Sequence, residues 1–235
     1  MAKALSTMQT NVGNMVRDTS SSLKTKITVW LNDAYQDAWR RCMWDELVDD
    51  DFTFTAVVDQ ANYVFSSGLS ITDFGEEIFV ADVTNGHSLT RKKSSAWWEE
   101  RARAYNAGSI SSGNPIYYRI LPESGAIQLD PPPDATDTYA MPYKKKVTDL
   151  SGSSDTISIT GLEYFMEHYA ISQAYAYKRQ FASAQYFLNL AEQFLAKRVK
   201  EEKTKFNEKY QRVLYGRRYP NYRNRLTGDL SYDSI

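Results

Sequence analysis

The sequence predicts an α+β fold, in which a helical core carries an inserted small antiparallel β subdomain and ends in an extended C-terminal arm. Apolar residues recur at helical spacing near both ends of the chain, whereas short β-branched and aromatic runs fill its middle. The last stretch has too few aliphatic residues to build a core. We therefore expect N-terminal helices in 1–50, the β subdomain in 51–149, C-terminal helices that complete the core in 150–209, and the arm in 210–235.

Two helices are expected in the N-terminal segment. The first is short and ends near Arg17, and the Ser/Thr run at 19–22 then offers candidate N-caps for the second. One apolar stripe of period 3.6 marks the second helix, formed by Ile27, Leu31, Ala34, Tyr35, Ala38 and Cys42. Because Cys42, the only cysteine, lies on this stripe, we interpret it as a small buried hydrophobe and not as a nucleophile.

The β subdomain begins after three successive aspartates, Asp49–Asp51, which end the helical pattern and predict a solvated loop. A calcium site is disfavoured there because no glycine turn or later bidentate glutamate completes the loop. Strands are expected at Phe52–Thr55, Val57–Val58, Ile78–Val80, Ile116–Leu121, Ala126–Leu129 and Thr138–Val147. The segment Arg91–Arg103, which holds two tryptophans, predicts either a short helix or an extended flap, and 106–114 predicts a loop.

The C-terminal helices are expected after a polar linker at 150–155. The residues Thr160–Glu163 have the spacing of a capping box and predict a helix from about Leu162 to Arg179. After a break near 180–183, a second helix is marked by Phe187, Leu190, Ala191, Phe194, Leu195 and Val199. Beyond Val199 the sequence becomes highly charged and predicts a solvated helical extension or arm.

The arm at 210–235 combines five tyrosines with five arginines, and its arginines exceed its aspartates by three. Such a segment is expected to be unfolded alone and to order on another surface, because tyrosine and arginine dominate interface hot spots. The candidate partner-binding residues are Tyr215, Arg217, Arg218, Tyr219, Tyr222, Arg223 and Arg225. An alternative interpretation makes the arm a nucleic-acid-binding module, in which the arginines clamp phosphates and the tyrosines stack on bases.

Catalytic, cofactor-binding and metal-binding motifs are not evident, so we expect a structural protein and not an enzyme. The two histidines, His87 and His168, fall on different predicted elements and lack patterned Cys or carboxylate partners. Glu99 and Glu100 are adjacent, whereas glycosidase carboxylates stand about 5 Å or more apart across a cleft. The net charge of −1 argues against a broad electrostatic drive toward nucleic acid, and no apolar run is long enough to predict a membrane partner.

The aromatic content is high, with 17 Tyr, 10 Phe and 5 Trp in 235 residues. Tyrosine and tryptophan are enriched at interfaces because they join a large apolar face to a polar tip. A tyrosine-rich core would account for the same composition, and composition alone does not separate the two.

The order of several short motifs resembles the adaptor, or head-to-tail connector, proteins of tailed bacteriophages, especially short-tailed ones. These motifs are Trp30–Tyr35, Cys42–Trp44, Gly113–Tyr118, Ile127–Asp134 and Thr138–Lys144, followed by the helix pair. The resemblance spans residues 20 to 200. It implies a virion protein at the capsid–tail junction, assembled in the host bacterial cytoplasm as a ring that is commonly of twelve copies.

The resemblance also implies the partners of that ring. It would dock under the portal protein, carry the tail nozzle and possibly tail fibres, and surround a channel through which double-stranded DNA passes without specific binding. By position and composition, the arm at 210–235 would engage the portal, and Asp49–Asp51 would suit an acidic channel surface. A tail-tube terminator or other completion protein is a further alternative, distinguished only by the identity of the neighbouring ring.

Overall fold

A computed structural model of the chain describes residues 3–108 and 111–216, with only the backbone described for Tyr105 and for 206–216. The α+β class is confirmed. The chain forms two compact units, one helical and one built from β-strands. The helical unit combines residues up to Leu47 with residues from Lys146 to Gln211, and the β unit contains Val48–Lys145.

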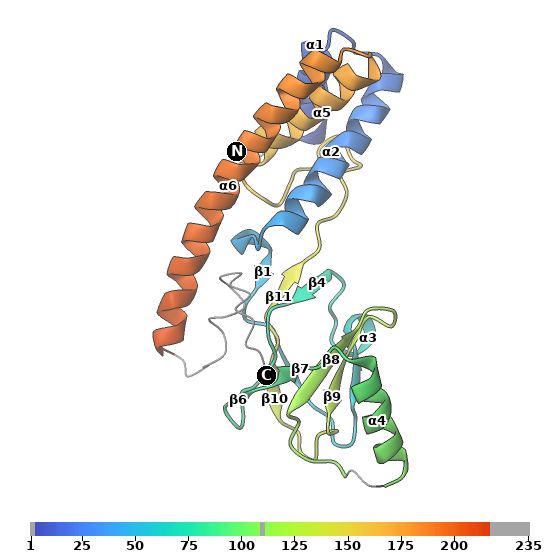
Figure 1. Cartoon of the computed structure of the whole chain (residues 1–235), viewed down its shortest axis with the longest axis vertical. Helices are drawn as coiled ribbons and strands as arrows, with labels where there is room; N and C mark the ends of the chain where they lie inside the picture. Colours follow the sequence, from blue (N-terminus) through green and yellow to red (C-terminus); the bar gives the residue numbers. More distant parts are fainter. Residues whose placement is uncertain (1–2, 109–110, 217–235) are drawn as a thin grey trace. The chain divides into compact units, whose positions relative to one another are not determined.

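The helical unit is built from helices that are far apart in sequence and lie side by side (Figure 1). Its elements are α1 (Leu5–Met15), α2 (Ser21–Arg41), the short 3₁₀ helix η1 (Asp45–Leu47), α5 (Glu163–Tyr177) and α6 (Phe181–Gly216). The predicted capping of the second helix is confirmed, because the Leu23 N–H donates to Ser20 Oγ at 3.4 Å. The predicted apolar stripe of α2 is buried along its whole length and packs mainly on α5.

The linker before α5 is polar, as expected, but it is held firmly against the first two helices. Asn32 on α2 donates to the Leu150 carbonyl at 3.0 Å and accepts from the Leu150 N–H at 2.9 Å. The Leu5 N–H donates to the Asp155 carbonyl at 2.8 Å. Hydrogen bonds from the backbone N–H groups of Ser151 and Gly152 lower the pKa of the Asp155 carboxyl.

The predicted capping box before α5 is wrong. The helix begins at Glu163 with Leu162 as its N-cap, and no side chain caps it. Gly161 has a φ of +84°, and this turn directs the Thr160 carbonyl toward Arg198, whose Nε donates to it at 2.9 Å. Thr160 therefore contributes its backbone carbonyl to a contact with α6, and the capping-box spacing does not produce reciprocal capping.

The β unit consists of three small sheets, whose strand orders are β1-β11-β4, β2-β10-β5-β6 and β3-β9-β8-β7. Every pairing is antiparallel except that of β7 with β8. The strands are β1 (Val48–Asp49), β2 (Thr53–Thr55), β3 (Asn62–Val64), β4 (Phe74–Glu77), β5 (Ala81–Asp82), β6 (His87–Ser88), β7 (Thr90–Arg91), β8 (Tyr117–Leu121), β9 (Ala126–Asp130), β10 (Thr138–Ala140) and β11 (Tyr143–Lys145). Two helices accompany them, α3 (Phe65–Gly68) and α4 (Ser95–Asn106).

Several local predictions in the β unit need correction. Val57 and Val58 lie in an exposed turn, and Ile78–Val80 connects β4 to β5 without forming a strand. Asp49 is not in a loop, since it pairs in β1 with β11 and its carboxylate lies 3.1 Å from Lys145 Nζ. The expected strand at 138–147 is divided into β10 and β11 around Pro142, which has no N–H to donate to a ladder.

Aromatic side chains supply much of the β unit's core. Phe54 stacks on Tyr139 with ring centroids 5.5 Å apart, and Tyr118 and Tyr139 are almost completely buried. Burial raises the pKa of the Tyr139 hydroxyl, and the carboxylate of Asp82 adds to that effect. Part of the chain's high aromatic content therefore belongs to a tyrosine-rich core.

Candidate interaction surfaces

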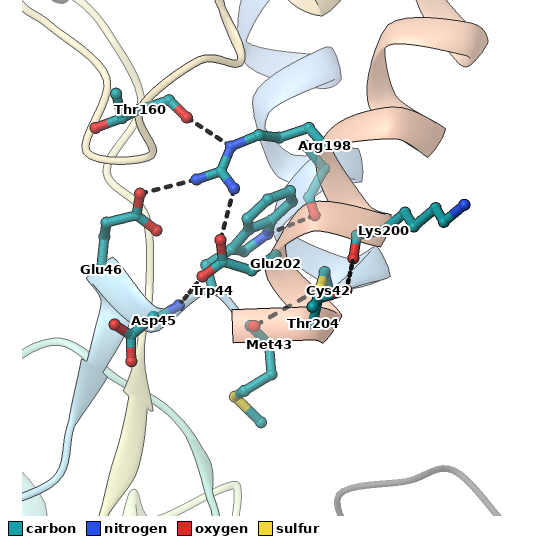
Figure 2. Close-up of polar contacts among 11 residues, drawn as sticks. Cys42, Met43, Trp44, Asp45, Glu46, Thr160, Arg198, Lys200, Glu202 and Thr204 are labelled. Carbon is teal, nitrogen blue, oxygen red and sulfur yellow. Dashed lines mark hydrogen bonds and ion pairs between the residues drawn. The ribbon is translucent and has the colours of Figure 1, made fainter. Parts of the chain in front are cut away.

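One arginine on α6 joins three segments of the helical unit, as Figure 2 shows. The Arg198 guanidinium donates to Glu202 at 2.6 Å, to Glu46 at 2.9 Å and to the Thr160 carbonyl at 2.9 Å. It also lies 5.4 Å from the centroid of the Trp44 ring, which is completely buried. We call these five residues the Arg198 cluster.

The Arg198 cluster is a buried charge network and not a surface ion pair. The side chain of Arg198 is 11% exposed and that of Glu202 is 1% exposed. Glu202 also accepts the Asp45 N–H at 2.7 Å, so each charged group keeps several partners. Removing one member of such a network leaves the other charge desolvated, which costs roughly 3–5 kcal/mol. The charged segment after Val199 was expected to be solvated, and among its described side chains at 200–205 only that of Glu202 is buried, where it links α6 to η1.

A continuous row of aromatic rings lies along the boundary between α5 and α6. Centroid distances of 5.2–6.0 Å join the rings of the row, beginning with Tyr164 on Phe194 at 5.8 Å and His168 on Phe194 at 5.2 Å. The row, which we call the α5–α6 aromatic surface, consists of Tyr164, His168, Tyr175, Tyr186, Phe187 and Phe194.

The α5–α6 aromatic surface is only partly used by the packing of the two helices. Phe187 and Tyr175 pack against the core, whereas Tyr186 is 61% exposed, Tyr164 55% and Phe194 40%. Large aromatic side chains that remain exposed together are typical of protein interfaces. His168, which was considered and set aside as a metal ligand, lies within this row.

A second exposed aromatic group flanks the turn between α5 and α6. Phe181 is 70% exposed and Tyr177 is 59% exposed. Tyr177 contacts Trp30 of α2 at a centroid distance of 6.3 Å, and Lys26 Nζ lies 4.9 Å from the Tyr177 centroid. Together with the aromatic surface, this group leaves the outer side of the α5–α6 pair rich in uncovered apolar area.

The expected start of the arm at Tyr210 is wrong, because α6 continues to Gly216. Tyr215 is therefore on a helix, and its side chain lies outside the description. The remaining candidate residues, Arg217, Arg218, Tyr219, Tyr222, Arg223 and Arg225, lie outside the described residues.

The residues weighed for catalysis or metal binding do not converge within the described part of the chain. His87 is on β6 of the β unit, whereas His168 is on α5 of the helical unit. Glu99 and Glu100 are exposed on α4, and Glu99 pairs with Arg103 one turn along. Cys42 is buried, as predicted. In residues 3–108 and 111–216, no three His, Cys, Asp or Glu side chains form a group that could hold a metal ion.

Sequence reasoning missed the Arg198 cluster. An arginine followed four residues later by a glutamate is a common helical pair, and its spacing alone indicates a solvated contact. The tryptophan directly after the α2 stripe was the available signal, because a buried Trp at a helix end requires covering residues from elsewhere. Among the helices that the structure describes, none is both long and apolar enough to cross a membrane.

The sequence of the chain matches the model of a known protein family. The sequence model of the family described as SU10 adaptor protein matches residues 3–215, which include both units. A search of curated proteins gave no match.

Proposed function

Because the chain belongs to the SU10 adaptor protein family of tailed phages, we propose that it forms the ring that joins the portal at the capsid vertex to the tail. The family gives the chain a structural adaptor role in the virion. In our proposal the ring consists of identical copies, twelve in number, and surrounds the channel through which DNA leaves. The tail nozzle, and possibly fibres, attach to it.

The observation that carries the ring proposal is the exposed aromatic area of the helical unit. The core of this unit is already complete, with Ile27, Leu31 and Met166 fully buried. The exposed rings of the α5–α6 aromatic surface are therefore surplus to the fold of one copy. Stable subunit interfaces are rich in Tyr, Trp and Phe at their centres, so a neighbouring copy is the partner that this surface fits best.

The arm's proposed role follows from the way α6 is held. The Arg198 cluster fixes α6 to the rest of the helical unit, and the helix then continues for 18 residues beyond Arg198, to Gly216. The residues that follow Gly216 therefore start from the end of a helix that is attached to the helical unit. We propose that Tyr215 and the Tyr/Arg residues of 217–235 leave from there to contact the portal.

Native mass spectrometry tests both parts of the proposal. The full chain and a chain ending at Gly216 are each measured alone and after mixing with the portal of the same phage. We expect the full chain to form a ring-sized complex with the portal, and the shortened chain to lose portal binding while keeping its fold. A full chain that never associates with the portal would refute the adaptor assignment, and undiminished docking of the shortened chain would refute the arm's role.

The same measurement separates the adaptor from a tail-completion protein. A completion factor binds the end of the tail tube and not the portal. Mixing the chain with each of the two purified rings therefore identifies its neighbour. Binding to the tail tube alone would favour completion.

A further inference from the structure

The β unit contains a basic cavity of about 510 Å³ beside helix α4 and strand β8. Its walls carry four cationic side chains, those of Arg91, Lys92, Lys93 and Arg119, against one carboxylate, that of Glu123. The side chain of Trp98 contributes to the lining. Ser95, the first residue of α4, also lines the cavity, so the positive end of a helix dipole adds to the field of the cations.

Of the two arginines that line the cavity, Arg119 is the one without a carboxylate partner. It stands on β8, and its guanidinium lies 4.5 Å from the centroid of the Trp98 ring. Its Nε donates to Gln128 Oε1 at 2.7 Å, which is a neutral acceptor on the neighbouring strand. No carboxylate among the described residues lies within ion-pair distance of it. Desolvation lowers the pKa of Arg119, which is the direction expected for a partly buried cation without a compensating anion.

Unlike Arg119, other arginines of the same region form ion pairs with carboxylates of the chain. Arg91 forms an ion pair with the buried carboxylate of Glu77. Arg101 on α4 binds Asp130 at 2.9 Å through both Nε and a terminal nitrogen. Where this unit uses arginine to hold its own fold, it supplies a carboxylate. At Arg119 the described chain supplies an aromatic ring and an amide, and leaves the charge open to the cavity.

We propose that this cavity binds an acidic segment of a partner protein, with Arg119 receiving an aspartate or glutamate side chain. Arginine binds carboxylates through two parallel hydrogen bonds, and the ring of Trp98 holds its plane in position for that contact. Lys92 and Lys93, which follow Arg91 along the same wall, receive further carboxylates of the segment. A cavity of this size accommodates a few side chains, which is the scale of a peptide contact.

Nucleic acid fits the same cavity less well. Proteins that bind single strands offer open aromatic faces on which bases stack. Here the aromatic rings beside the cavity are already covered by cations of the chain. Lys92 lies 5.7 Å from the Trp97 centroid and 4.8 Å from the Tyr117 centroid, while Arg101 lies 5.6 Å from the Trp97 centroid. The cations also converge in a concavity, whereas duplex binding uses a basic stripe that follows the phosphates.

The proposal is tested with the full chain and a fluorescein-labelled octaglutamate peptide, whose binding is followed by fluorescence anisotropy at low and high salt. Arg119→Gln and Lys93→Gln each remove one positive charge from the cavity. Arg103→Gln is the matched control, since it removes one charge from an 83% exposed side chain of α4 that does not line the cavity. Thermal unfolding of each variant confirms that the fold is kept. The Trp98 indole N–H, which donates to the Lys92 carbonyl at 2.9 Å, gives a local signal by nuclear magnetic resonance.

We expect Arg119→Gln to weaken binding about tenfold or more, because a charge-assisted contact contributes about 1.5–3 kcal/mol. Lys93→Gln should weaken it less, and Arg103→Gln should leave it within about twofold of the original. The Trp98 signal should shift on peptide addition to the unsubstituted chain and to Arg103→Gln, and should shift much less in Arg119→Gln at the same peptide concentration. Failure of the peptide to bind at low salt, or equal weakening by Arg119→Gln and Arg103→Gln, would overturn the proposal.

Short duplex DNA and inorganic phosphate serve as competing ligands. Displacement of the peptide by DNA, with the same dependence on Arg119, would overturn the peptide assignment in favour of nucleic acid. Ring formation with the portal is measured separately for Arg119→Gln and is expected to persist. Loss of the peptide site with an intact ring therefore bears on this inference alone, and loss of the ring in the unsubstituted chain bears on the proposed function alone.

Discussion

Replacing Arg198 with methionine removes the charge at the centre of the Arg198 cluster while keeping a long apolar side chain above Trp44. Glu202 is then left with a 1% exposed carboxylate whose remaining partner is the Asp45 N–H. Breaking one member of a buried ion pair costs roughly 3–5 kcal/mol. For a chain of this size that corresponds to a fall in Tm of roughly 6–20 °C, followed by helical circular dichroism.

The chain contains a matched control for this substitution. Arg41 also binds two carboxylates, with Nη atoms 2.6 Å from Asp37 and 2.6 Å from Glu192, yet its side chain is 42% exposed. Arg41→Met should therefore cost only about 0–1 kcal/mol, because solvent screens exposed ion pairs. Equal losses from Arg41→Met and Arg198→Met would refute the argument that burial gives the Arg198 cluster its strength.

A double substitution sharpens the test. Arg198→Met combined with Glu202→Met removes both charges and leaves no desolvated carboxylate. We expect the pair to be more stable than Arg198→Met alone, because replacing a buried ion pair with apolar side chains is often close to neutral. Additive losses in the double variant would show that the two side chains do not interact as the distances indicate.

Three further predictions follow from the helical unit. Tyr164→Ser combined with Phe194→Ser should prevent ring assembly in native mass spectrometry and lower monomer stability by about 1–2 kcal/mol, which leaves the monomer folded, whereas Val29→Ser, at another exposed apolar position, should leave the ring intact. Asp155→Asn should lower Tm at neutral pH. Since the folded pKa of this carboxyl lies below its ordinary 3.8, its contribution is present above that pH and disappears as the pH falls through the folded value, where variant and original should converge. Gly161→Ala should destabilise the chain by about 1 kcal/mol in chemical unfolding, because its φ of +84° strains any residue with a Cβ.

The helical unit was the part of the fold most open to prediction, and the reason is local. A stripe such as Ile27, Leu31 and Ala38 repeats with the period of the helix that buries it, so sequence spacing and burial carry the same information. The end of α5 was predictable for the same reason. Its start was also predicted to within one residue, but its capping was not, because Thr160 and Glu163 have capping-box spacing while Gly161 turns the chain between them.

The sequence predicted that the β unit consists of short strands, but it did not predict where each strand lies. Its strands are two to five residues long, so a β-branched run such as Ile78–Val80 can connect two strands as readily as form one. Tertiary pairing decides between these outcomes, as it does for Asp49, whose strand depends on β11 nearly a hundred residues away.

The residues of the basic cavity could not be predicted from the sequence for a related reason. Arg119 and Trp98 are unremarkable in sequence, and only the packing of α4 on the face of β8 and β9 that carries Tyr117 and Gln128 brings them together.

The two candidate surfaces depend on different interactions, and this difference has a consequence for assembly. The α5–α6 aromatic surface is apolar, so contacts made through Tyr164 or Phe194 are not screened by salt. The cavity around Arg119 works through charge, so its contacts weaken as the ionic strength rises. A ring held by the first can therefore persist under conditions that release a partner held by the second. Under the two proposals, one subunit would form a permanent interface through the helical unit and an exchangeable one through the β unit, which has its own core. A protein that must first close a ring and then accept further components needs both kinds of contact.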